Sequence, residues 1–90
     1  MKYVKVIWHH DFDDEPVSYF HEVGDDNYET RRVQVYRDGH REWADENHET
    51  ATAGLAEIPI APVDEITSQP EFDAAEITRD EFETEWSRAQ

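Results

Sequence analysis

The stretch that most constrains the fold is an apolar run near the N-terminus that leads directly into a polar turn. The run YVKVIW is rich in β-branched and aromatic residues and contains no Gly or Pro, which favours a β-strand over residues 2–9. Because side chains alternate between the two faces of a strand, Val4, Val6 and Trp8 share one face. Apolar residues also occupy the other face, which predicts a central strand or one covered on both faces. We expect Val4, Val6 and Trp8 to face the aromatic residues of the C-terminal helix.

Three further strands are expected before residue 45. Pro16 opens the second strand, since proline is tolerated at the first residue of a strand, and a GDDN turn at 24–27 closes it. The third strand covers 28–37. The Asp38-Gly39 pair after it is typical of a type I′ hairpin turn, and the fourth strand covers 40–44. Four consecutive strands with short connections predict an antiparallel meander.

The second half of the chain begins with a long irregular segment. Residues 45–62 lack clean periodicity and are interpreted as a loop, either functional or packed across the sheet, with apolar residues that favour packing. Residues 63–68 are expected to form one helical turn that ends before Pro70. Residues 72–77 fit either a short edge strand or an extended arm.

The clearest helix signal lies at the C-terminus. Thr78 as N-cap and Glu81 three residues later form a capping box. Phe82 and Trp86 are four residues apart, so they make one apolar stripe that can pack on a sheet. The predicted fold is therefore α+β: a four- to five-stranded antiparallel meander sheet with a C-terminal α-helix packed on one face. It forms a single domain over residues 1–90.

The strongest compositional feature is acidity, with 23 Asp+Glu against 8 Lys+Arg and a net charge of −15. Such a field repels nucleic-acid phosphates and anionic lipid headgroups, so neither is an expected partner. A basic protein would be attracted. Acidic surfaces also arise as an aid to solubility or as an adaptation to high salt, and the composition leaves both interpretations open.

Other classes are excluded or disfavoured by what the sequence lacks. The chain has no cysteine, which excludes disulfides, zinc–thiolate sites and thiol nucleophiles. No apolar run approaches the roughly 18 residues of a membrane span. The N-terminal MKYVKVIW has no small-residue cleavage site and is typical of a strand, not a signal peptide. We therefore expect a cytoplasmic protein.

Metal-competent residue types crowd the polar turn at 9–15, HHDFDDE. In a continuing strand His9 and His10 point to opposite faces, so both cannot bind one ion. The turn also lacks the spacing of a calcium-binding EF-hand loop. His21 is the one further imidazole considered as a ligand. The favoured interpretation is a solvated acidic turn, so no metal and no cofactor are predicted.

No catalytic residue is predicted either. Pairs of acids such as Asp13 with Asp14, or Asp25 with Asp26, fall in turns, whereas a catalytic acid needs a pocket that shifts its pKa. None of the three serines lies in a nucleophile-elbow context, and the three glycines form no phosphate loop. The sequence thus favours a protein that is not an enzyme.

Charged and aromatic residues on the strands admit two interpretations each. Arg31 and Arg32 are expected to form ion pairs with neighbouring glutamates of the sheet, such as Glu22 or Glu29. The alternative is that the two arginines bind an acidic ligand between them. Four aromatic residues either form a binding face or cover the sheet beneath the 45–62 loop, and we favour the covering role. These residues are Tyr19, Tyr28, Tyr36 and Trp43.

Taken together, these motifs resemble a family of small bacterial proteins of about this length catalogued as a domain of unknown function. Its pattern has W-x-H-D, D-E-P-V, Y-E-x-R-(K/R)-V, D-G, A-D-E and a closing I-(S/T)-x-x-x-F-E-x-x-W helix. The matching residues here are Trp8 to Asp11, Asp14 to Val17, Tyr28 to Val33, Asp38-Gly39, Ala44 to Glu46, Ile77-Thr78, Phe82-Glu83 and Trp86. The resemblance implies no activity. It does imply an association with small acidic immunity and antitoxin-type proteins.

The first functional hypothesis is a non-enzymatic acidic binding module that neutralises a basic protein partner, as an immunity protein or antitoxin does. The contacts are expected from acidic turns. The predicted contact residues are Asp11, Asp13, Asp14, Glu15, Asp25, Asp26, Asp45 and Glu46. The alternatives are a small-ligand or metal-binding domain that uses the aromatic face and a histidine, or a structural domain with a salt-adapted surface.

Overall fold

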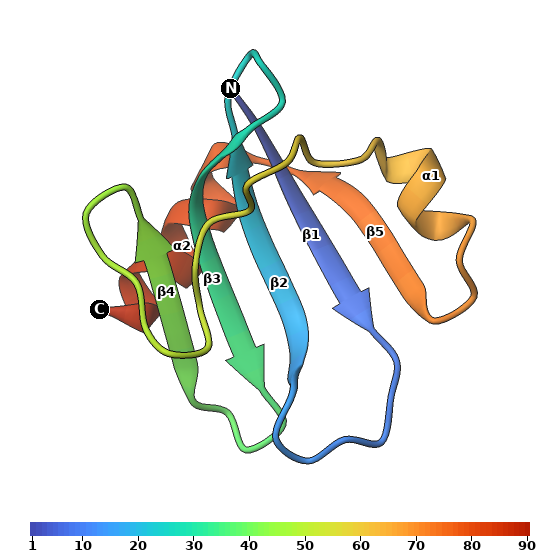
Figure 1. Cartoon of the computed structure of the whole chain (residues 1–90), viewed down its shortest axis with the longest axis vertical. Coiled ribbons are helices and arrows are strands. Elements are labelled where there is room, and N and C mark those ends of the chain that lie inside the picture. The colour runs from blue at the N-terminus through green and yellow to red at the C-terminus, as the bar shows by residue number, and fades with distance from the viewer.

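The computed structural model describes residues 1–90 and shows an α+β fold built on one antiparallel sheet (Figure 1). The strands are β1 (Lys2–Trp8), β2 (Pro16–Val23), β3 (Glu29–Tyr36), β4 (Arg41–Asp45) and β5 (Phe72–Ile77). The helices are α1 (Val63–Thr67) and α2 (Arg79–Ala89). The strand order is β4-β3-β2-β1-β5. The predicted α+β fold, a four- to five-stranded antiparallel sheet with a C-terminal helix, is therefore confirmed, and the sheet has five strands.

The N-terminal strand lies inside the sheet, as its two-sided apolar pattern predicts. β1 pairs with β2 on one side and with β5 on the other, both antiparallel. The segment 72–77 is thus an edge strand and not an extended arm. Strands β1 to β4 form the expected meander, and the chain then returns across the sheet so that β5 can pair with β1 (Figure 1).

The hydrophobic core lies between the sheet and α2. Phe82 has no exposed surface and packs on Tyr3, with ring centroids 5.3 Å apart, while Phe20 and Val33 complete the buried cluster. The capping box of Thr78 is present as predicted and starts the helix. The position of α2 on the sheet is therefore set by the packing of Phe82, the first residue of its apolar stripe.

The prediction that Val4, Val6 and Trp8 face the helix is wrong. Tyr3 contacts Phe82, so its face of β1 is the one covered by α2, and side-chain alternation turns Val6 and Trp8 to the opposite face. Both faces of β1 are apolar, so alternation alone does not determine which one the helix takes.

The Asp38-Gly39 turn differs in type from the prediction. A type I′ turn needs positive φ at both central residues, but only Gly39 has it, at +92°. Gly39 N–H donates to the Tyr36 carbonyl, and Tyr36 N–H donates to His40, so the connection is a three-residue loop. β3 accordingly ends one residue earlier than expected, at Tyr36, and β4 begins one residue later, at Arg41. Asn27, with φ of +68°, holds the equivalent position in the β2–β3 turn.

The long loop crosses the uncovered face of the sheet, as its apolar residues predict. Residues 53–61, here called the strap, run from the β4 side towards α1 in front of β3, β2 and β1 (Figure 1). Ile60 N–H donates to the Asn27 carbonyl at 2.8 Å, and Ala53 is buried against the sheet. The fold therefore covers one sheet face with α2 and the other with the irregular strap.

No helix is both long and apolar enough to cross a membrane.

Candidate functional site

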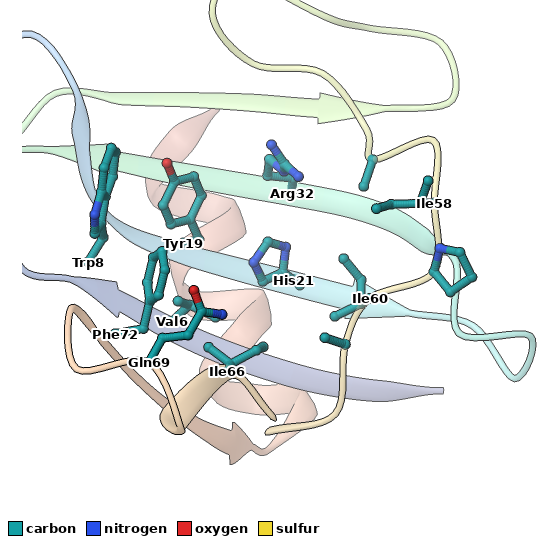
Figure 2. A pocket seen from close by; sticks show the side chains of 13 residues that line it. Val6, Trp8, Tyr19, His21, Arg32, Ile58, Ile60, Ile66, Gln69 and Phe72 are labelled. Atoms are coloured by element: carbon teal, nitrogen blue, oxygen red, sulfur yellow. The ribbon is translucent and has the colours of Figure 1, made fainter. Parts of the chain in front are cut away.

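On the sheet face opposite α2, the strap and α1 border an apolar groove of about 540 Å³ (Figure 2). The sheet contributes Val6, Trp8, Tyr19, His21, Arg32 and Phe72, and the remaining walls come from Ile66, Gln69 and strap residues 56 and 58–61. Nine of the thirteen lining residues are hydrophobic. Ligand pockets in proteins are typically about 300–1,000 Å³ with mostly apolar walls, so this groove has the dimensions of a binding site.

A buried charged network forms the polar part of this groove. The Glu29 carboxylate has no exposed surface and accepts from His21 Nδ1 and from Arg32, whose Nε lies 3.0 Å from Oε1. Arg32 Nη1 also donates to Gln34 at 3.2 Å. Burial alone would raise the pKa of the Glu29 carboxyl, but the hydrogen bonds and charges of His21 and Arg32 outweigh it and hold this pKa below its usual value. Glu29 is therefore an ionised acceptor.

The same carboxylate fastens the strap over the sheet. Ala56 N–H donates to Glu29 Oε1 at 2.9 Å, which joins the strap to the His21–Arg32 network. A second attachment lies nearer β4, where Gln34 Nε2 donates to the Thr52 carbonyl and Tyr36 O–H donates to the Thr52 hydroxyl. The Ala56 bond holds the strap against the floor of the groove, and the Thr52 bonds anchor the residue that precedes the strap.

The aromatic side chains are divided between the two faces of the sheet. Tyr19 lies in the groove and stacks parallel to His21, with ring centroids 5.9 Å apart. Tyr36 lies beneath the loop, as the covering interpretation predicts. Trp43 packs on Trp86 on the helix side, and Tyr28 is exposed, so for these two the covering prediction is wrong.

The acidic turns predicted as contact residues lie at the two ends of the sheet. The residues between β1 and β2, which include Asp11, Asp13, Asp14 and Glu15, are exposed beside the Trp8 end of the groove. The His10 ring packs on Trp8 at a tilt of 53° with centroids 4.1 Å apart, which keeps this turn against the groove. Asp25 and Asp26 occupy the opposite end, next to the strap residue bonded to Asn27. Two of the predicted acidic sets therefore flank one groove.

The third acidic set lies apart from the groove. Asp45 and Glu46 are at the end of β4, the edge strand two positions from β2, and neither lines the groove. Asp45 is half-buried and its carboxylate accepts from Asn47 N–H at 2.8 Å, while Glu46 is exposed. The structure does not join these two residues to the other six.

The histidines considered as metal ligands do not converge. His9 bonds Asp73 at 2.7 Å, His10 Nε2 bonds the Pro16 carbonyl at 2.8 Å, and His21 lies in the groove. No three potential ligand side chains are grouped to hold an ion. The arginine pairing is confirmed: Arg31 pairs with Glu22, and Arg32 with Glu29.

Sequence reasoning missed the groove network, although hairpin register carried a signal for it. The turn after Val23 places His21 directly opposite Arg32 in the β2–β3 pairing. Side chains of directly paired residues share a face, so this register brings His21 and Arg32 together on one face of the sheet. Helix α2 covers the other face. The strap that turns this face into a groove has no comparable sequence signal.

The fold and the groove define a small α+β domain whose helix covers one sheet face and whose other face carries an apolar site with a His–Glu–Arg network. The chain matches the family described as Domain of unknown function (DUF6881) over residues 2–90, and it belongs to that family. No curated protein and no solved structure matches it.

Proposed function

We propose that this protein is a non-enzymatic binding module that neutralises a basic protein partner, in the manner of an immunity protein or antitoxin. The observation that carries the proposal is the groove on the strap face, which is mostly apolar and is flanked at both ends by exposed acidic turns. Interfaces commonly combine an apolar centre with a polar rim. Here the rim is acidic, which suits a basic partner.

The charge supplies attraction and the groove supplies the contact that excludes water. A net charge of −15 accelerates the encounter with a basic surface. This attraction weakens as added salt screens the charges. Apolar side chains of the partner then enter the groove and bury the accessible surface of Ile58, which is exposed, and of Trp8 and Phe72, which are half-buried. Occlusion of the partner's working surface would be the inhibitory step.

The groove also supports a binding role over a catalytic one. His21 is its only histidine, and no Ser, Thr or Cys lines it, so the imidazole has no nucleophile to activate. The Glu29 carboxylate is occupied by His21, Arg32 and Ala56. This arrangement fixes the wall of a site and leaves one ring nitrogen to contact a ligand.

The test uses three double charge reversals that change the net charge equally. Each Asp or Glu to Lys change adds two charges, so D13K/D14K, D25K/D26K and D45K/E46K each take the chain from −15 to −11. Proteins retained from a lysate of the native host at low salt are compared for all three variants. We expect a saturable partner that the first two variants lose and the third retains.

The matched third variant separates a specific face from general acidity. Equal loss of binding in all three variants, with only abundant basic proteins retained, would contradict the proposal. Asp13 and Asp14 are exposed and make no side-chain hydrogen bond, so D13K/D14K should leave the thermal midpoint nearly unchanged. Circular dichroism melts of each variant check that lost binding is not lost folding.

A further inference from the structure

The end of the groove nearest the loop between β1 and β2 is aromatic and open. Trp8 and Phe72 line the groove there, with stacked rings whose centroids are 6.2 Å apart, at the end opposite Ile58 (Figure 2). Phe12 lies just outside, with its ring centroid 6.2 Å from that of Trp8, and it is 59% exposed. These three residues, here called the aromatic corner, therefore extend the apolar surface of the groove onto the loop.

Phe12 is exposed but held in place. Its backbone N–H donates to His10 Nδ1 at 3.0 Å, and its ring stacks on the His10 ring with centroids 5.4 Å apart. His10 in turn bonds the Pro16 carbonyl through Nε2 at 2.8 Å and packs on Trp8. A large apolar side chain that is already fixed loses little conformational entropy when a partner covers it. Phe12 therefore has the properties of an interface anchor.

The charge beside the aromatic corner is negative and is not neutralised within the protein. The acidic residues of the loop are exposed, and their carboxylates form no ion pair and no hydrogen bond. They are Asp11, Asp13, Asp14 and Glu15. Arg37 reaches this loop, but its guanidinium donates to the His10 carbonyl at 2.6 Å and not to a carboxylate. Exposed aromatic rings next to unpaired carboxylates are complementary to a cation.

The helix side of the same sheet shows how such a combination holds an arginine. There the guanidinium of Arg31 lies over the rings of Phe82 and Trp86, with Cζ 4.8 Å from each centroid. Those two centroids are 6.2 Å apart, the same separation as between Trp8 and Phe12. Two glutamates of that side form ion pairs with the same guanidinium. The aromatic corner has the same components, two neighbouring rings and carboxylates, without a cation.

We propose that the aromatic corner binds an arginine side chain of the partner protein. This inference deepens the proposed function and rests on it, because the basic partner supplies the arginine. The flat guanidinium stacks on Phe12, its aliphatic carbons pack on Trp8, and the loop carboxylates accept its hydrogen bonds. Arginine is preferred to lysine because a guanidinium is planar and more weakly hydrated than an ammonium group. Arginine is also enriched at interface hot spots.

The experiment is a peptide titration that separates the flat cation from charge alone and from apolar bulk alone. The probes are acetylated, amidated tripeptides with Arg, Lys, citrulline or norleucine between two glycines. Each is titrated at pH 7.5 and equal ionic strength into ¹⁵N-labelled protein, with the Trp8 indole N–H and the Phe12 amide followed by NMR. The Arg peptide should bind about threefold more tightly than each of the others.

Ring variants locate the effect. Phe12→Ala removes the exposed ring and keeps every charge, so the Arg-to-Lys affinity ratio should fall to about one. Tyr28→Ala makes the same kind of change at an exposed aromatic side chain beside the other acidic turn, outside the groove, and should keep the ratio of the wild type. Phe12→Leu keeps apolar bulk without a ring and should also lose the Arg preference. It keeps the test decisive if the alanine variant does not fold.

The remaining outcomes overturn either the arginine site or the basic partner. Binding of the Lys or citrulline peptide equal to that of the Arg peptide, or an unchanged ratio in Phe12→Ala, would overturn the arginine site. Tightest binding of the norleucine peptide would assign the corner to an apolar side chain, and no shift with any peptide would leave it without a ligand. Both results overturn this inference and leave the proposed function standing. An arginine preference without a saturable partner in the lysate experiment would keep the arginine site and contradict the neutralising function.

Discussion

The Glu29 carboxylate is the most informative single position, because it joins the groove, the strap and the buried ion pair. It has no exposed surface and accepts from His21 Nδ1, from Arg32 Nε at 3.0 and 3.1 Å, and from Ala56 N–H at 2.9 Å. Glu29→Gln keeps the size and shape of the side chain. It removes the charge and replaces one acceptor oxygen by an amide nitrogen, which donates hydrogen bonds and cannot accept them.

The size of the effect follows from the burial of the partners. Removing one member of a fully buried ion pair costs about 3–5 kcal/mol, because the other charge stays buried without compensation. The Arg32 side chain is 18% exposed, so water recovers part of its solvation. We therefore expect a loss of about 2–4 kcal/mol at pH 7, which a small domain with about 5–15 kcal/mol of stability tolerates.

The pH dependence has a definite sign. The folded-state pKa of Glu29 lies below its value of 4.5 in the unfolded chain, so the unfolded state takes up its proton first as the pH falls. The contribution of Glu29 is fully present above pH 4.5 and is lost as the pH falls through the folded-state pKa. Glutamine does not titrate. The difference in stability between the wild type and Glu29→Gln should narrow as the pH falls below about pH 4.5.

Urea unfolding followed by tryptophan fluorescence measures this difference at each pH. Glu71→Gln is the matched control, since Glu71 is exposed and its carboxylate has no partner, and it should change the free energy of unfolding by less than about 0.5 kcal/mol. A cost for Glu29→Gln equal to that of the control, or a difference that widens in acid, would refute the assignment of Glu29 as an ionised buried acceptor.

Three further substitutions and one control, Ile58→Ala, test the packing, the helix cap and the turn of the fold, each by urea unfolding. Phe82→Ala should cost about 3–5 kcal/mol because Phe82 is fully buried, whereas Ile58→Ala, at a side chain 71% exposed, should stay within about 0.5 kcal/mol. Thr78→Ala removes the N-cap of α2 and should cost about 1 kcal/mol, with faster hydrogen exchange at the Glu81 amide. Gly39→Ala places a Cβ at φ of +92° and should cost about 1–2 kcal/mol, and no loss of stability would mean that the turn has another conformation.

The elements predicted most accurately are those fixed by interactions between neighbours in the sequence. The capping box of Thr78 and Glu81 and the start of β2 at Pro16 lie where local chemistry places them. The central position of β1 was also predictable, because apolar residues on both faces require cover on both sides. Local rules determined the elements and their order within the meander.

The face covered by α2 was not predictable, because it depends on contacts between distant residues. Tyr3 and Trp8 are both aromatic and lie on opposite faces of one strand, so the β1 pattern favours neither. Register decides the matter: Phe20 and Val33 pair directly and give the Tyr3 side a continuous apolar floor, while the other side receives His21 opposite Arg32. Helix α2, which packs through Phe82, therefore buries more apolar surface on the Tyr3 face than it would on the face that carries His21 and Arg32.

The position of α2 also explains why acidic turns, and not basic residues, flank the groove. Four of its six arginines, Arg31, Arg32, Arg41 and Arg88, form ion pairs with glutamates. Arg31 lies over the Phe82 and Trp86 rings, its carbon Cζ 4.8 Å from each centroid, so the α2 side uses cations as part of its packing. The turns at 11–15 and 25–26 contain no cation of their own. The Met1 ammonium lies 3.3 Å from Asp25, but the remaining acids of these turns form no ion pair, and their charge stays at the two ends of the groove, where a basic partner would meet it.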